Sequence, residues 1–356
     1  MIVLLHGWSD RSESFKPLVR ELGKLGLHDI VPIYLGDYVS MDDDVTFDDI
    51  VQAMQAAWKK AGLPTSPRSV DVIVHSTGAL VIRHWMTARY KPETNPVRRL
   101  LMLAPANFGS HLAHKGVSFL GRIVKGFKSD RLFHTGAKIL RGLELASPYS
   151  WELARKDRFQ PEARWYGPGR VLTTVLVGTD GYGGISAAAN TNGSDGTVLV
   201  STANLDPAFV RFDFATTPSQ PQMVMLDVNG RTAFCRIPKE NHASIACKDD
   251  GPKHPATLQL IRQALQVDDA GFEAHCQALA TLHITSDSRS GLASTSKPPC
   301  AVTSCSKARI SPTTISAGGS GTVSSRPAMS SHVPSGSVSS QITTAVPPGR
   351  SSASPA

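Results

Sequence analysis

The hydrophobic pattern of residues 1–282 consists of two kinds of segment. Short runs rich in Val, Ile and Leu are typical of strands buried on both faces of a parallel sheet. Other segments carry apolar residues at helical spacing. The predicted strands are residues 1–5, 30–34, 69–74, 99–104 and 171–177, and the clearest predicted helices are residues 47–61, 79–86, 255–266 and 271–282. This alternation predicts an α/β fold with a mainly parallel central sheet flanked by helices.

Two more apolar runs lie at residues 223–228 and 231–236. They are separated by Asn229-Gly230, a dipeptide that favours tight two-residue hairpin turns. The pattern therefore predicts an antiparallel hairpin directly before the segment that contains His242.

The segment Ile73-Val74-His75-Ser76-Thr77-Gly78-Ala79 joins a predicted strand to a predicted helix through a very short reversal. Such a reversal forces strained dihedral angles and lifts Ser76 over the carboxyl edge of the sheet. The first amides of the helix then point at any negative charge that forms beside the serine. We interpret Ser76 as a nucleophile; the alternative is a serine that only caps the helix.

This segment resembles the nucleophile elbow of α/β-hydrolases, G-x-S-x-G, with Val74 where the first glycine is expected. The bulk of Val74 predicts a slightly wider turn. A second resemblance lies at the start of the chain, where the strand 1–5 is followed by His6-Gly7-Trp8, similar to the oxyanion loop of lipases. The resemblance implies that the backbone amides of Trp8 and Thr77 hold the oxyanion during acyl transfer.

A serine hydroxyl needs a base to take its proton and a carboxylate to orient that base, and in this family both follow the serine. Ser194-Asp195-Gly196-Thr197-Val198 resembles the acid loop of bacterial lipases, which favours Asp195; Asp180, directly after the strand 171–177, is the rival. Asn241-His242-Ala243-Ser244-Ile245 resembles their histidine loop, which favours His242. The competing histidine is His254, whose proline context suits a helix cap.

The resemblance covers about residues 1–280 and is nearest to bacterial lipases, esterases and lipase-like phospholipases. It implies a serine hydrolase that cleaves carboxylic esters through a Ser76-His242-Asp195 triad and an acyl-enzyme intermediate. Two alternatives stay open: an inactive hydrolase scaffold that binds lipid or a partner, and a thioesterase, amidase or acyltransferase with the same proton relay. We expect no cofactor and no metal, since the five cysteines lack metal-ligand spacing.

The composition divides the chain into a hydrolase domain, residues 1–284, and a Ser/Pro/Thr-rich tail, residues 285–356, that we expect to be disordered. A linker or glycosylated stalk, or a shifted reading frame, would each explain the tail. Within the domain, an insertion at about residues 107–162 has helical periodicity and predicts a cap over the acyl pocket. A small helical subdomain with its own core is the alternative.

The net charge of +8 is unevenly distributed. Residues 107–146 carry seven Lys or Arg and two acids, which predicts peripheral contact with anionic membranes through a basic cap. A solvated basic face is the alternative. Residues 107–146 and the tail each carry a net charge of +5, so the total of +8 comes from these two segments. The total is therefore no signal for nucleic acid, which we do not expect as a partner. No apolar run reaches transmembrane length, and no signal peptide is visible, so we expect cytoplasmic residence, with export lacking such a signal as the alternative.

Overall fold

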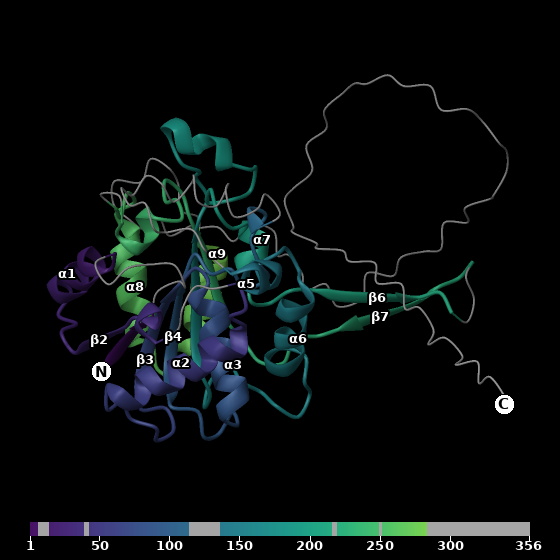
Figure 1. Cartoon of the computed structure of the whole chain (residues 1–356), viewed down its shortest axis with the longest axis horizontal. Coiled ribbons are helices and arrows are strands. Elements are labelled where there is room, and N and C mark those ends of the chain that lie inside the picture. Colours follow the sequence, from purple (N-terminus) through teal and green to yellow (C-terminus); the bar gives the residue numbers. More distant parts are fainter. Residues whose placement is uncertain (6–13, 39–42, 114–135, 216–218, 249–250, 283–356) are drawn as a thin grey trace. The chain divides into compact units, whose positions relative to one another are not determined.

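The computed structural model describes the whole chain except residues 6–13, 39–42, 114–135, 216–218, 249–250 and 283–356. Its centre is a six-stranded sheet in the order β2-β1-β3-β4-β5-β8 (Figure 1). Every neighbouring pair in this sheet is parallel, as predicted. The strands are β1 (Ile2–Leu5), β2 (Ile30–Ile33), β3 (Val70–His75), β4 (Val97–Leu103), β5 (Leu172–Gly178) and β8 (Ala233–Ile237).

Helices cover both faces of this sheet, with α1 and α8 on one side of the strands and α3 and α6 on the other (Figure 1). The helix predicted over residues 79–86 continues to Arg89, and the other three form within one residue of their predicted ends. The helices are α1 (Lys16–Lys24), α2 (Phe47–Lys60), α3 (Gly78–Arg89), α5 (Ala137–Gly142), α6 (Pro148–Asp157), α7 (Val200–Ala203), α8 (Ala256–Gln266) and α9 (Phe272–Thr281). Short 3₁₀ turns occur at η1 (Leu35–Asp37), η3 (Gly184–Ala189) and η4 (Ser244–Ala246).

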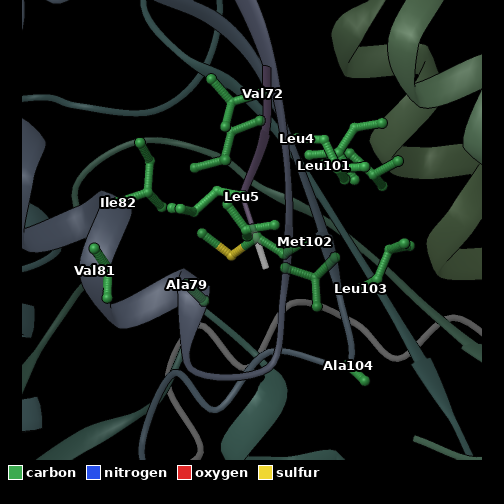
Figure 2. Packing of buried hydrophobic residues seen from close by; sticks show 14 of the residues in the cluster. Leu4, Leu5, Val72, Ala79, Val81, Ile82, Leu101, Met102, Leu103 and Ala104 are labelled. Carbon is green, nitrogen blue, oxygen red and sulfur yellow. The ribbon is translucent and has the colours of Figure 1, made fainter. Parts of the chain in front are cut away.

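Part of the hydrophobic core lies where α3 crosses β1, β3 and β4. Figure 2 shows side chains of this helix, among them Ala79 and Ile82, gathered with Leu5 and Met102 of the strands. Trp85, one turn further along α3, packs on Trp58 of α2 with ring centroids 4.6 Å apart. Because α3 is buried against the sheet on one side and against α2 on the other, its first turn is held rigidly beneath Ser76.

The predicted hairpin around Asn229-Gly230 is wrong. The first of its two runs lies in β7 (Gln222–Leu226), which pairs antiparallel with the preceding strand β6 (Phe209–Asp213), whereas the second run forms β8 beside β5. Asn229 instead donates its side-chain amide to the carbonyls of Gln160 and Pro161. A Cβ on Gly230 would lie 2.3 Å from the carbonyl oxygen of Tyr166. The glycine therefore allows the backbone at position 230 to pack closely against the backbone of Tyr166. The second run pairs with β5 instead of folding back on the first, because burial beside β5 outweighs the local turn preference.

The predicted cap insertion is described at residues 107–113 and 136–162, where α5 and α6 form and α6 packs on α3. Ile139, Leu140 and Leu143 of the predicted apolar face are buried. The remainder of the insertion, and the tail from residue 285, lie outside the described residues. The domain boundary and the covering role of the insertion therefore stay predictions.

Candidate active site

Ser76 lies in the reversal between β3 and α3, with a φ of 55°. This left-handed conformation is costly for a residue that has a Cβ, and such strain is concentrated at functional sites. The reversal is held from both sides, since the Ser76 amide donates to the Leu103 carbonyl (3.2 Å) and the Ser76 carbonyl accepts from Ala106 (3.1 Å). The serine is partly exposed although β3 itself is buried, which leaves its hydroxyl accessible.

His242 follows β8 on a short loop and faces Ser76. Its Nε2 lies 3.0 Å from the Ser76 Oγ, and its Nδ1 lies 3.0 Å from the Asp195 Oδ2. The two ring nitrogens are therefore both engaged, and a neutral imidazole with its proton on Nδ1 can accept the serine proton at Nε2. The structure thus brings His242 together with Ser76, 166 positions away along the chain, and with Asp195, 47 positions away.

Asp195 lies in the loop between β5 and α7 and is fully buried. Its Oδ1 accepts hydrogen bonds from the amides of Thr197 (2.9 Å) and Val198 (2.8 Å), which leaves Oδ2 for the histidine. The Asp195 backbone carbonyl also accepts a hydrogen bond from the His242 amide (3.0 Å). The loop that carries Asp195 and the loop that carries His242 are therefore joined by one backbone contact and one side-chain contact. A buried carboxylate with these partners is suited to stabilise an imidazolium.

The rival residues have other positions. Asp180 is exposed, and the hydrogen bond described for its carboxylate comes from the hydroxyl of Thr179 (3.1 Å). His254 is buried, with its Nδ1 accepting from the Ala256 amide (3.1 Å) at the start of α8. Asp180 therefore faces solvent rather than the His242 ring, and His254 helps to cap a helix, as its proline context suggested.

Of the two predicted oxyanion donors, Thr77 lies within the described residues and Trp8 does not. Thr77 is the residue directly before α3, with a φ of −62° and a ψ of −20°, so its amide belongs to the first turn of that helix. An amide there lies in the positive end of the helix dipole. Trp8 lies outside the described residues, and its role stays a prediction.

His75, which the sequence motifs did not single out, contacts His242 from the end of β3. Its Nε2 lies 2.8 Å from the His242 carbonyl oxygen, and the two rings approach at 4.6 Å between centroids. The ring of Phe15 packs edge-on against His75 at 5.8 Å. His75 therefore links the strand that carries the serine directly to the loop that carries the histidine.

Glu240, two residues before His242, is fully buried and was also missed. A carboxylate at such a site costs desolvation energy unless its oxygens are satisfied. Its four hydrogen-bond donors are the hydroxyls of Ser244 (2.5 Å) and Thr257 (2.6 Å) and the amides of Lys253 and His254 (2.9 Å each). The carboxylate thereby fastens the histidine loop to the start of α8. No short motif marked Glu240 in the sequence, because its partners His254 and Thr257 lie 14 and 17 residues further along the chain.

A buried ion pair fixes α3 further from the serine. Arg83 donates to both carboxylate oxygens of Asp157 on α6, at 2.7 and 2.9 Å, and to the Asn107 carbonyl at 3.0 Å. Tyr166 donates a third hydrogen bond to Asp157 (2.7 Å). Burial lowers the pKa of the Arg83 guanidinium, but the charge and hydrogen bonds of Asp157 outweigh it, so the net shift is upward.

Within the described part of the chain, His, Cys, Asp and Glu side chains form no cluster that could hold a metal ion. Among the same residues, no helix is long and apolar enough to cross a bilayer.

Comparisons with known proteins agree with this architecture. Phospholipase PlaB from Legionella pneumophila is 26% identical over 79% of this chain, with a TM-score of 0.63, and the same phospholipase in complex with thio-NAD is 25% identical over 79%, with a TM-score of 0.59. The chain spans 63% and 61% of these two structures, respectively. Bacillus licheniformis lipase BlEst2 in mature form is 17% identical, covers 69% of this chain and 85% of its own, and has a TM-score of 0.41, too slight a likeness to carry an argument. A search of curated proteins gives no match.

Residues 2–170, which contain β1 to β4 and the Ser76 reversal, match the sequence profile of the alpha/beta hydrolase family. The acid and histidine loops lie beyond that match, on strands that complete the same parallel sheet. By this sheet the chain has the alpha/beta hydrolase fold, and its residues 2–170 match the alpha/beta hydrolase family.

Proposed function

We propose that this hydrolase cleaves carboxylic esters with apolar acyl groups, as a lipase, esterase or phospholipase. One observation carries the proposal: the hydrogen-bonded series from the Ser76 hydroxyl through the His242 ring to the buried Asp195 carboxylate. The likeness to a bacterial phospholipase at 26% identity supports a lipid ester as the substrate class.

In the proposed reaction, the Ser76 Oγ attacks the ester carbonyl carbon while its proton passes to the His242 Nε2. The carbonyl oxygen becomes an oxyanion that the amides of Thr77 and Trp8 would hold. Collapse of this intermediate breaks the bond to the alcohol, which leaves with the proton from His242. Water then attacks the acyl-enzyme by the same route, and the acid is released. Asp195 holds the Nδ1 proton in place throughout and stabilises the transient imidazolium.

The test of the nucleophile is labelling with a fluorophosphonate probe, followed by hydrolysis of p-nitrophenyl esters of increasing acyl length. Ser76→Ala should abolish labelling and lower kcat by roughly 10⁴- to 10⁶-fold. Ser69→Ala is the matched control, because the Ser69 hydroxyl bonds to the Ser66 carbonyl at the start of the same strand. An unlabelled wild-type protein that hydrolyses none of these esters would favour the inactive-scaffold alternative instead.

The choice of acid has its own test. Asp195→Asn should lower kcat by about 10³- to 10⁴-fold, because the amide favours the wrong tautomer of His242. Asp180→Asn should stay close to wild type, since Asp180 is exposed. Full activity in Asp195→Asn would overturn the assignment.

Contact of the basic segment 107–146 with anionic membranes remains part of the proposal, although most of its cations lie outside the described residues. Of the two that are described, Lys138 pairs with Asp44 at 3.2 Å, and both side chains of that pair are exposed. Such exposed charges are screened by salt. Activity on vesicles should therefore rise with anionic lipid at low salt and lose that dependence at high salt; equal rates in all four conditions would reject the membrane contact.

A further inference from the structure

His75 is the last residue of β3 and comes directly before Ser76. It is 3% exposed, and its ring Nε2 lies 2.8 Å from the backbone oxygen of His242. A carbonyl oxygen can only accept a hydrogen bond, so the Nε2 of His75 carries a proton and donates it. The residue next to the proposed nucleophile therefore binds the backbone of the proposed base.

This hydrogen bond completes a short closed path between the two reacting side chains. One peptide bond joins Ser76 to His75, the His75 ring leads to the His242 carbonyl, and the His242 ring returns to the Ser76 Oγ at 3.0 Å. The rings of the two histidines also pack on each other, with centroids 4.6 Å apart. The path therefore leaves little freedom in the distance between the Ser76 Oγ and the His242 Nε2.

Other contacts fasten the loop that carries His242 to other elements. The His242 amide donates to the Asp195 carbonyl at 3.0 Å, and the Glu240 carboxylate accepts from the amides at the start of α8. Neither of these two contacts comes from β3. The hydrogen bond from His75 does, so of the three it is the one that fixes the loop relative to the nucleophile.

The Ser76 reversal, for its part, is attached to β4 and the segment after it. The Ser76 amide donates to the Leu103 carbonyl, and the Ser76 carbonyl accepts from the Ala106 amide. These backbone contacts determine where the serine lies, but they do not reach the loop of the base. The side chain of His75 joins the two parts of the site.

We propose that His75 is a positioning residue for the proposed ester hydrolysis, whose ring N–H keeps the His242 imidazole within reach of the Ser76 hydroxyl. The inference rests on the proposed function, because it assigns a role in the same reaction. His75 transfers no proton through this bond, since a backbone carbonyl does not take up a proton at neutral pH. Its effect comes from geometry, and a misplacement of about 1 Å in an active site can lower the rate about 100-fold.

The test compares three replacements of His75 that separate the donor from the ring. Glutamine carries its amide nitrogen the same number of bonds from Cβ as the histidine Nε2, asparagine is one bond shorter, and phenylalanine keeps a ring without a donor. His75→Gln should keep kcat for a p-nitrophenyl ester within about fivefold of the wild type. His75→Asn and His75→Phe should each lower kcat about 10- to 100-fold, with KM nearly unchanged.

The rate must be counted per competent site, because a purely structural role for His75 would reduce the amount of folded enzyme. Labelling to completion with the fluorophosphonate probe gives the number of competent sites, and kcat is divided by that number. His275→Phe is the matched control. It removes a histidine that contacts the buried hydroxyl of Thr174 on β5 (3.0 Å), away from the triad, and should leave kcat per site within about twofold.

Wild-type kcat per labelled site in His75→Phe would overturn the proposal, because the donor would then be dispensable. Equal kcat in His75→Gln and His75→Asn would overturn it as well, and this comparison decides alone if the phenylalanine variant does not fold. A change confined to KM, or to the number of labelled sites, would also reject the positioning role. A wild type that takes up no probe would instead reject the proposed function itself.

Discussion

Replacing Asp157 by asparagine tests how far the buried ion pair holds α3 in place. Both Asp157 and Arg83 are fully buried, and the carboxylate receives two hydrogen bonds from the guanidinium and one from Tyr166. Asparagine keeps the volume but removes the charge. The guanidinium would then remain charged and buried without a counter-ion, with one amide oxygen of the new side chain and the Asn107 carbonyl as its acceptors.

The expected cost is about 3–5 kcal/mol of unfolding free energy, because removing one partner leaves the other charge buried and uncompensated. That is a large share of the roughly 5–15 kcal/mol that stabilises a typical protein. With a urea m-value of about 2–3 kcal/mol/M, the midpoint should fall by roughly 1–2 M. The double variant Arg83→Met/Asp157→Leu should lose less than the sum of the two single changes, since no lone charge is left behind.

The assay is urea unfolding at pH 7 followed by far-UV circular dichroism. Glu273→Gln is the control, because it breaks the exposed Arg231–Glu273 pair (3.4 Å), which should contribute less than about 1 kcal/mol. If Asp157→Asn unfolded within about 1 kcal/mol of the wild type, as this control should, the ion pair would not be holding α3. The reasoning from burial would then be wrong.

Three further predictions concern other groups that are buried or partly buried. Glu240→Gln should lower kcat about 10- to 100-fold with little change in KM. The amide nitrogen of glutamine would face hydrogen-bond donors that in the wild type donate to a carboxylate oxygen. An unchanged kcat would show that Glu240 does not position the histidine loop. Burial lowers the pKa of His275 below its ordinary value of about 6.5, so the stability gained by keeping it neutral is present above that value and lost as pH falls through the lowered pKa. His275→Gln should therefore flatten the decline in unfolding free energy measured from pH 7 to pH 5, and an unaltered decline would assign it to other groups. Burial raises the pKa of Cys235 and of Cys247 to about 12, so peptide mapping should find neither labelled by iodoacetamide in native protein at pH 8; rapid labelling would contradict the buried positions.

The sequence predicted the parallel sheet well because fully buried strands have a signature of their own. The runs that became β3 and β5 are buried at every residue and rich in Val, Ile, Leu and Thr, and neither strand lies at an edge of the sheet. The pairing of the later strands could not be read in the same way. Asn229-Gly230 carries a strong local signal for a hairpin turn between β7 and β8. However, β7 pairs with β6, which precedes β7 in the chain, and β8 pairs with β5, which lies some 60 residues earlier. Tertiary pairing of this kind overrides turn preference.

The residues of the candidate site also differ in how far the local sequence reveals them. Ser76, Asp195 and His242 each lie in a short motif, so local sequence was enough to nominate them. His75 and Glu240 act through contacts with His242 and with α8 that no local pattern encodes. In the sequence, His75 before the serine and Glu240 before the histidine look like ordinary residues next to a motif, and only the folded sheet brings them to their partners. Supporting residues are thus harder to predict than the residues they support, because their role is defined by long-range contacts.

The departure from the family pattern at Val74 has a simple structural explanation. Val74 is the fifth residue of β3, is fully buried, and lies between Leu5 of β1 and Met102 of β4 in the register of the sheet. An extended, buried position of this kind favours a β-branched side chain. The left-handed conformation that the reversal requires is taken by Ser76 two residues later. A glycine at position 74 would therefore relieve no unfavourable φ, and the valine packs the strand while the strain stays on Ser76.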